Sequence, residues 1–287
     1  MIRLGLIGDP VEHSLSPAMH RAALEACGLE GEYALIPIAA GDRAALRHEL
    51  QRVRAGEWQG LNVTIPHKRP VADLLDTLTP TAAAIGAVNT VVLQEGRLVG
   101  DNTDAAGFLE ALRRFLDAHD RPEGTGQRAL VLGAGGAARA VVYALCSSGW
   151  EVAVAARRVD QARALASDLA NREVDVLDFH GLPAVADRVA PCSLVVNATP
   201  VGMHPHVDES PWPDGLPFPR QAALYDLVYV PGTTRLVRDA RAAGMPAVTG
   251  LDMLIEQALL SFVRWTGHTP SRDRMLDAAR RQLMAVS

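Results

Sequence analysis

The chain has 287 residues, which is enough for two α/β domains of ordinary size. It is 48% hydrophobic and 21% charged, a composition typical of a globular protein with a substantial core. A formal net charge of −5 gives no sign of nucleic-acid binding, and no apolar stretch is long enough to cross a membrane.

Strand-like and helix-like segments alternate along the chain, which predicts an α/β protein with two domains and mostly parallel sheets. In the first domain we expect strands at 2–8, 32–38 and 60–65, a hairpin of 88–93 with 97–100, and helices at 17–27, 42–54, 67–76 and 80–86. A helix over 105–117 and a polar loop over 118–127 lead to expected strands at 128–132, 151–155, 194–196, 223–226 and 247–249. Further helices are expected at 138–145, 252–267 and 271–285, and a long loop at 203–220.

The cysteines and histidines predict no metal site. Cys27, Cys146 and Cys192 are too scattered for zinc, and their odd number argues against a complete disulfide framework. We therefore expect cysteines that pack in the core and a cytoplasmic protein. His204 and His206 lie on the expected long loop and are interpreted as surface residues.

A glycine-rich turn joins the strand at 128–132 to the helix at 138–145. Gly133 permits a tight turn, and Gly135 allows the backbone to approach a pyrophosphate. Ala138 stands where a third small residue allows close packing of helix on strand, and N–H groups at the helix start would bind phosphates. Many turns need glycine, but the strand, the spacing and the helix together predict a Rossmann-type dinucleotide-binding domain.

The end of the following strand indicates which dinucleotide is bound. NAD-specific sites usually have Asp or Glu here, which binds the ribose 2′-hydroxyl. This chain has Ala156, Arg157 and Arg158 instead, and a guanidinium can bind a 2′-phosphate in bidentate fashion. The alternative is a solvated arginine pair at a strand end. We favour NADP(H) as the cofactor.

The first polar cluster of the first domain contains Ser14 and Ser16. Ser16 precedes Pro17 and is predicted to be a helix N-cap, with proline at the first helical position. A capping serine can also lie beside the positive helix end, where a substrate carboxylate would be stabilised. Capping alone explains Ser14 less well.

Further polar residues lie near other strand ends. Period-2 alternation puts Asn62 and Thr64 on one face of a strand. Three residues nearby each have an ordinary interpretation: Lys68 as a solvated surface lysine, Asn89 as a turn residue, and Asp104 as a helix cap.

Taken together, these motifs resemble the shikimate dehydrogenases of the bacterial shikimate pathway. The matching segments occur in the same order as in the family and extend over nearly the whole chain. They are residues 8–20, 62–68, 86–90, 102–104, 133–138, 197–203, 226–229 and 250–257. The resemblance implies reversible NADPH-dependent reduction of 3-dehydroshikimate to shikimate, on the route to chorismate and the aromatic amino acids.

The resemblance also implies roles for individual residues. Lys68 would be the general acid/base, paired with Asp104; a lysine is protonated at neutral pH, so we expect mainly a proton donor. The implied substrate-binding residues are Ser14, Ser16, Thr64, Lys68, Asn89, Asp104, Tyr229 and Gln257. The implied cofactor-binding residues are Gly133, Ala134, Gly135, Gly136, Ala137, Ala156, Arg157, Arg158, Leu227 and Gly250.

The implied domain organisation is a substrate-binding domain at 1–104, completed by 250–287, and a Rossmann NADP-binding domain at 105–249. The C-terminal helices would return to the first domain, and the protein would be a monomer or a homodimer without nucleic-acid or membrane partners. Two departures stand out. The family often has Asn-Arg-Thr where this chain has Ala156-Arg157-Arg158, and Val230 replaces a common asparagine.

Two alternative functions remain open at this point. A relative that oxidises quinate or an amino analogue of shikimate would share most of these motifs, although the arginine pair argues against the NAD-using members. A catalytically silent NADP-binding regulator would keep the fold, but the intact Lys68 and Asp104 argue against it.

Overall fold

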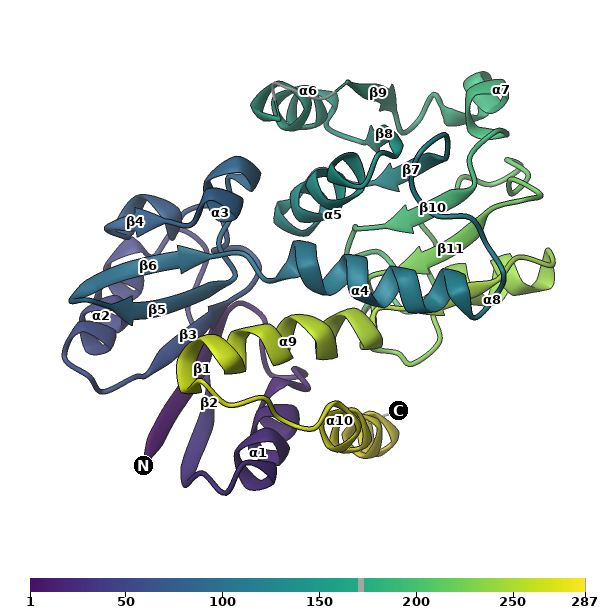
Figure 1. Ribbon diagram of the computed structural model, residues 1–287. Coiled ribbons are helices and arrows are strands. Elements are labelled where there is room, and N and C mark those ends of the chain that lie inside the picture. Colours follow the sequence, from purple (N-terminus) through teal and green to yellow (C-terminus); the bar gives the residue numbers. More distant parts are fainter. Residues whose placement is uncertain (170–172, 287) are drawn as a thin grey trace. The chain divides into compact units, whose positions relative to one another are not determined.

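The computed structural model describes residues 1–169 and 173–286 (Figure 1). The chain divides into two compact units, one made of Met1–Gly107 with Ile255–Ser287 and the other of Phe108–Leu254. Helices α4 (Asp104–Asp117) and α9 (Leu251–Thr266) carry the chain from one unit to the other. The predicted α/β class and the return of the C-terminal helices to the first unit are confirmed.

The first unit contains a six-stranded mixed sheet with the order β2-β1-β3-β5-β6-β4. β1 is parallel to β2 and β3, β4 is parallel to β6, and β5 is antiparallel to both β3 and β6, as the predicted hairpin requires. The strands are β1 (Ile2–Gly8), β2 (Gly31–Pro37), β3 (Gly60–Val63), β4 (Thr77–Leu78), β5 (Thr90–Gln94) and β6 (Arg97–Asp101).

The helices of the first unit bury apolar stripes against this sheet. In α2, Leu46, Leu50 and Val53 recur at helical spacing and pack with Ile7 and Leu61 of the sheet. Helix α1 packs against both β2 and α10. The complete helices of this unit are α1 (Ser16–Ala26), α2 (Arg43–Arg54), α3 (Pro80–Ile85) and α10 (Arg272–Val286), with a 3₁₀ turn η1 (Ala72–Leu74).

The helix predicted over 67–76 is wrong. Residues 65–71 form successive turns, and only the short η1 follows before β4. The physical reason is Pro70, which lacks a backbone N–H and disfavours the helical conformation at Arg69. The two-residue strand β4 was missed because it is too short to show a periodic pattern.

The second unit contains a six-stranded, fully parallel sheet with the order β12-β11-β10-β7-β8-β9. Counted from β7, this is the 3-2-1-4-5-6 order of the Rossmann fold, read in reverse, so the predicted fold of this unit is confirmed. The strands are β7 (Arg128–Leu132), β8 (Glu151–Ala156), β9 (Val174–Asp178), β10 (Leu194–Asn197), β11 (Ala223–Asp226) and β12 (Ala247–Thr249).

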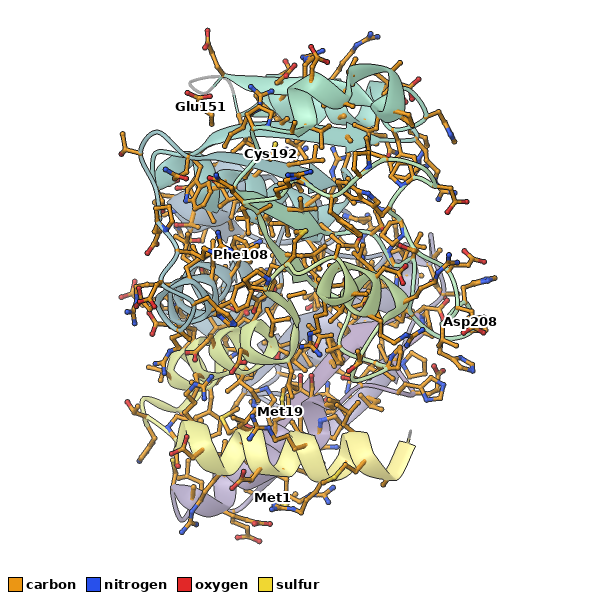
Figure 2. All side chains as sticks on the ribbon, turned by 90° about the vertical axis from the view of Figure 1, so that its right-hand side faces the viewer. Met1, Met19, Phe108, Glu151, Cys192 and Asp208 are labelled. Atoms are coloured by element: carbon orange, nitrogen blue, oxygen red, sulfur yellow. The ribbon has the colours of Figure 1, made fainter. Side chains whose placement is uncertain are left out.

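The second unit has a core of its own. Figure 2 labels Cys192, which is buried in this core with Leu130, Val195 and Leu224. The predicted loop over 203–220 contains neither helix nor strand, yet its Trp212 is buried in the same core. The helices of this unit are α5 (Gly136–Ser147), α6 (Val159–Asp168), α7 (Ala186–Val189) and α8 (Arg235–Ala242), with a 3₁₀ turn η2 (Leu182–Val185).

Within the part of the chain that the structure describes, no helix combines the length and apolar character needed to span a bilayer.

An aromatic cluster in the first unit encloses His20 of α1. The imidazole stacks on Tyr33 with ring centroids 4.3 Å apart, and Phe262 and Trp265 lie beside it. Neither ring nitrogen has a hydrogen-bond partner among the described residues. Burial therefore disfavours the charged form and lowers the pKa of His20 to about 3.

We predict that His20 makes the protein sensitive to acid. The unfolded chain takes up the histidine proton near the ordinary pKa of 6.5, whereas the native chain resists protonation until about pH 3. Stability is therefore fully present above the unfolded pKa and is lost as the pH falls. Relative to His20→Leu, the wild type should lose about 2 kcal/mol of unfolding free energy between pH 7 and pH 5. Urea unfolding of both proteins across this range measures the difference, and parallel pH profiles would contradict the prediction.

Candidate active site

A buried ion pair lies at the centre of the first unit's polar residues. Lys68 follows β3, and its Nζ donates to Oδ2 of Asp104, the first residue of α4, at 2.6 Å. The two side chains are only 13% and 6% exposed. Lys68 is therefore not a solvated surface lysine. Asp104 does not cap α4 through its side chain either, because Asn102 Oδ1 accepts the hydrogen bond from the Ala105 N–H.

Asn89 joins this ion pair to α9. Its Nδ2 lies 2.9 Å from Asp104 Oδ1 and 3.3 Å from Gln257 Oε1, and its Oδ1 accepts from the Thr103 N–H at 2.8 Å. The interpretation of Asn89 as a simple turn residue is therefore wrong. Four of the predicted site residues, Lys68, Asn89, Asp104 and Gln257, form one connected group of buried polar side chains.

Ser14 and Ser16 lie at the start of α1, but not in the predicted way. The N-cap position is Leu15, with helical dihedral angles and no side-chain cap, so the prediction that Ser16 caps the helix is wrong. Ser16 is already inside the first turn, and Ser14 two residues upstream accepts its N–H at 3.2 Å. Both serines are buried beside the positive end of the helix.

Thr64 lies directly after the carboxyl end of β3, beside the segment that follows β1 and leads to Ser14 and Ser16. Its N–H donates to Ile7 O at 2.8 Å, and the N–H of Asp9 donates to Ile65 O at 2.9 Å. Because β1 and β3 are parallel neighbours, the segments after their carboxyl ends run side by side. The half-buried Thr64 thus lies at the same end of the sheet as the segment that follows β1.

Sequence analysis did not identify Thr90, Thr103 or Ser261 as site residues. It placed Asn62 on the same strand face as Thr64 but gave it no role in the site. All four are buried polar side chains that hydrogen-bond to one another around Asn89. One signal was available for Ser261: it lies four residues after Gln257, hence on the same face of the helix.

The glycine-rich turn of the second unit lies at the carboxyl end of β7. Gly133 has φ +108°, and a Cβ there would come within 3.1 Å of Ala198 O and Thr199 Cγ2, in the segment after β10. β7 and β10 are neighbours at the point where the strand order reverses, which is where such sheets bind dinucleotides.

Helix α5 begins at Gly136, two residues earlier than predicted, with Gly135 as its N-cap and no side-chain cap. The N–H groups of Gly136 and Ala137 are thereby available to an anion. A Cβ on Gly135 would meet nothing within 4 Å, so the backbone following Ala134 is open to close approach. This helix start fits a pyrophosphate.

Arg157 and Arg158 follow β8, which is the neighbour of β7. Both side chains are exposed, and neither guanidinium is ion-paired with a carboxylate of the described chain. The preceding Ala156 is buried. Two unpaired cations at this strand end fit a 2′-phosphate and would attract it.

A buried carboxylate holds the loops after β10 and β11. Asp226 Oδ1 accepts from Asn197 Nδ2 at 2.8 Å and from the Val228 N–H at 3.1 Å, and Oδ2 accepts from Thr234 Oγ1 at 2.6 Å. Desolvation outweighs these hydrogen bonds and raises the pKa of Asp226 to about 6.

Two predicted cofactor residues meet beyond these loops. A Cβ on Gly250 would lie 2.3 Å from Leu227 O, so these backbones are in direct contact. Tyr229 is half-buried in the same unit.

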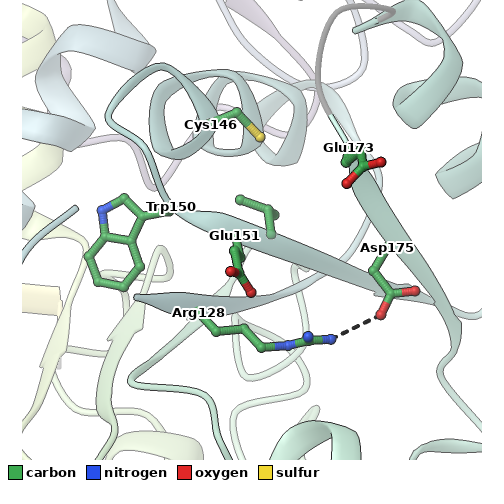
Figure 3. A pocket seen from close by; sticks show the side chains of 7 residues that line it. Arg128, Cys146, Trp150, Glu151, Glu173 and Asp175 are labelled. Carbon is green, nitrogen blue, oxygen red and sulfur yellow. Dashed lines mark hydrogen bonds and ion pairs between the residues drawn. The ribbon is translucent and has the colours of Figure 1, made fainter. Parts of the chain in front are cut away.

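A separate cavity of about 450 Å³ lies at the amino-terminal ends of β7, β8 and β9, away from the carboxyl ends where the glycine turn lies (Figure 3). Its lining includes the carboxylates Glu151, Glu173 and Asp175, and Asp175 pairs with Arg128 at 2.9 Å. Carboxylates would repel a pyrophosphate, so this cavity is distinct from the dinucleotide site. Across residues 1–169 and 173–286, no cluster of three or more His, Cys, Asp or Glu side chains could hold a metal ion.

Family models match most of the chain. The model described as the shikimate dehydrogenase substrate binding domain matches residues 6–91, that of shikimate / quinate 5-dehydrogenase matches 117–205, and that of the shikimate 5′-dehydrogenase C-terminal domain matches 250–280. The shikimate dehydrogenase (NADP(+)) of Salinibacter ruber is 45% identical over 283 residues, which cover 96% of this chain and 95% of the relative. The chain belongs to the shikimate dehydrogenase family.

Solved structures of the family agree with this assignment. Shikimate 5-dehydrogenase from Thermus thermophilus, in complex with NADP(H) and shikimate, is 44% identical with a TM-score of 0.84, covering 98% of this chain and 100% of that one. Quinate dehydrogenase from Corynebacterium glutamicum, in complex with NAD, is 35% identical with the same TM-score of 0.84, covering 96% and 98%. The family resemblance found in the motifs is confirmed.

We predict that Asp226 gives a pH response opposite to that of His20. Its native pKa of about 6 lies above the unfolded value of 3.8, so the cost of burying its charge is present above pH 6 and is relieved as the pH falls. Relative to Asp226→Asn, which does not titrate, the wild type should gain about 1 kcal/mol of unfolding free energy between pH 7 and pH 5. Urea unfolding of both proteins measures this change, and a relative loss for the wild type would contradict it.

Proposed function

We propose that this chain catalyses the reversible, NADPH-dependent reduction of 3-dehydroshikimate to shikimate. The observation that carries the proposal is the buried Lys68–Asp104 pair, with Nζ and Oδ2 2.6 Å apart and the Asn89 amide on the other carboxylate oxygen. A ketone reduction needs a proton donor where negative charge develops on oxygen, and Lys68 provides one beside groups that can hold ring hydroxyls.

The substrate would be held by the first unit. Ser14 and Ser16, at the positive end of α1, bind its carboxylate. Asn89, Gln257 and Thr64 bind ring hydroxyls, and the family resemblance implies that Tyr229 also contacts the substrate. A site made of several buried amides and hydroxyls discriminates against analogues that lack hydroxyls, because its own polar groups would then lose their partners.

The cofactor would be held by the second unit. The residues around the glycine turn, from Gly133 to Ala137, hold the pyrophosphate, and Arg157 and Arg158 hold the 2′-phosphate. Leu227 and Gly250, whose backbones are in contact, would lie near the nicotinamide. When bound, NADPH supplies the hydride that adds to the substrate carbonyl carbon.

The proton follows a short path. As the carbonyl oxygen gains negative charge, Lys68 Nζ donates a proton to it and is left neutral beside Asp104. Asp104 holds Nζ in place and accepts a substrate hydroxyl hydrogen bond. In the oxidative direction, neutral Lys68 takes the proton back from the hydroxyl.

We predict that shikimate with NADP⁺ gives the highest kcat/KM among the four pairings of shikimate or quinate with NADP⁺ or NAD⁺. In Arg157→Ala/Arg158→Ala the KM for NADP⁺ should rise at least about tenfold, because charge-assisted hydrogen bonds contribute about 1.5–3 kcal/mol each. NAD⁺ lacks the 2′-phosphate and is the internal control, so its KM should not change. If quinate with NAD⁺ were the best pair, the chain would be a quinate dehydrogenase instead.

Replacing Lys68 should separate chemistry from cofactor binding. We expect Lys68→Ala to lower kcat at least about 100-fold, because a positioned general acid contributes roughly 10²- to 10⁴-fold. The Kd for NADP⁺, measured by fluorescence titration, should stay within twofold. Lys68→Arg keeps the positive charge beside Asp104 but donates a proton poorly, so it should be folded and nearly as slow. Near-normal turnover in either variant would refute the role of Lys68.

A further inference from the structure

A buried network of hydroxyl and amide side chains lies behind the ion pair of the first unit. Its members are Asn62, Asn89, Thr90, Thr103 and Ser261, none more than 5% exposed. They come from β3, β5, the segments beside β5 and α4, and α9. Polar groups so far from water are tolerated only when each is hydrogen-bonded.

Ser261 stands where these segments meet. Its Oγ lies 3.0 Å from Asn62 Nδ2, 2.9 Å from Thr90 Oγ1 and 3.1 Å from Thr103 Oγ1. It also donates to the carbonyl oxygen of Gln257, one turn earlier in α9, at 3.0 Å. A single hydroxyl thus links α9 to three other segments of the unit.

The hydrogen bonds of Asn62 and Ser261 identify several donors and acceptors of the network. Asn62 Oδ1 accepts from the Tyr33 hydroxyl at 2.9 Å, so its Nδ2 donates to Asn89 O and to Ser261 Oγ. Since the Ser261 proton goes to Gln257 O, Ser261 Oγ is an acceptor toward its other neighbours, the hydroxyls of Thr90 and Thr103.

The groups that surround Asn89 leave one orientation for its amide. Thr90 Oγ1 donates to Asn89 Oδ1 at 2.9 Å, and the Thr103 N–H donates to the same oxygen. Asn89 Nδ2 must then face Asp104 and Gln257. A flipped amide would place its NH₂ group against the N–H of Thr103.

Steric fit fixes the same part of α9. A Cβ on Gly107 would lie 2.6 Å from the backbone N of Gln257 and 2.9 Å from its Cα and Cβ. The backbones of α4 and α9 therefore touch at this glycine, and Gln257 has no room to shift toward α4. The Ser261 hydroxyl acts one turn further along the same helix.

We propose that Ser261 is a positioning residue for the substrate site. Its hydroxyl sets the register of α9 against β3, β5 and the start of α4, and so places the Gln257 and Asn89 amides for ring hydroxyls that Ser261 does not itself touch. This inference rests on the proposed function. Alanine would be the better helix former at this position, so helix propensity gives no reason for a serine here.

The test compares two alanine substitutions in α9. Ser261→Ala removes one oxygen from the network. Thr266→Ala is the matched control, because Thr266 Oγ1 also bonds the carbonyl four residues earlier, Phe262 O at 2.9 Å, without reaching the network. Isothermal titration calorimetry measures the Kd for shikimate without cofactor, and steady-state kinetics separate KM from kcat.

We expect Ser261→Ala to weaken shikimate binding about tenfold and to raise its KM in proportion, as the loss of a buried hydrogen-bond partner commonly does. The Kd for NADP⁺ and kcat should stay within threefold. Thr266→Ala should bind shikimate like the wild type.

Each other outcome has a definite meaning. A wild type that does not bind shikimate would refute the proposed function itself. If the wild type binds but Ser261→Ala matches it within twofold, the positioning role alone is refuted. Equal losses in both variants would assign the effect to the helix, and loss of cooperative unfolding in Ser261→Ala would make the serine a folding residue; both results overturn the proposal.

Discussion

The burial of Lys68 and Asp104 constrains the polar side chains that surround this pair in the first unit. Desolvation of the Lys68–Asp104 pair is costly, and it is offset only when the remaining lone pairs are also satisfied. Asp104 meets this requirement through Asn89, which is buried and so needs fixed partners in turn. The Thr103 N–H and the Thr90 hydroxyl donate to Asn89 Oδ1, and the Thr103 hydroxyl lies 3.1 Å from Ser261 Oγ, so three segments of the chain help to hold one carboxylate.

The proposed sites of the two units differ in the groups that they offer to a ligand. The first relies on side chains, whose amides and hydroxyls are oriented by other buried side chains. The second relies on the backbone: free N–H groups at the start of α5 and a glycine that tolerates φ +108° beside the segment after β10. Its main side-chain contributions are Asp226, which ties two loops together, and an exposed arginine pair. A backbone site can be recognised from a short motif, whereas a side-chain network cannot.

The sequence predicted most strands and the glycine turn because period and composition are local properties. It failed where the outcome depended on distant residues. The two-residue strand β4 is identified only by its pairing with β6, about 20 residues later. The helix predicted after Lys68 is the exception, because Pro70, which breaks it into turns, is a local signal. The pairing of Lys68 with Asp104 came from family resemblance, since nothing local connects residues 36 positions apart. The helical spacing places Ser261 on the same face as Gln257, but nothing local shows that its hydroxyl bonds Asn62, 199 positions away.

That separation has a consequence for how the protein is made. Asn62, Asn89 and Asp104 leave the ribosome early, yet Gln257 and Ser261 join them only after the whole second unit has been synthesised. Until residue 255 is made, the first unit has all six strands of its sheet but lacks the segment that carries Gln257 and Ser261, whereas the second unit is complete in sequence. The second unit can therefore fold before the first is complete, and the buried network around Lys68 gains its last members only when α9 is made.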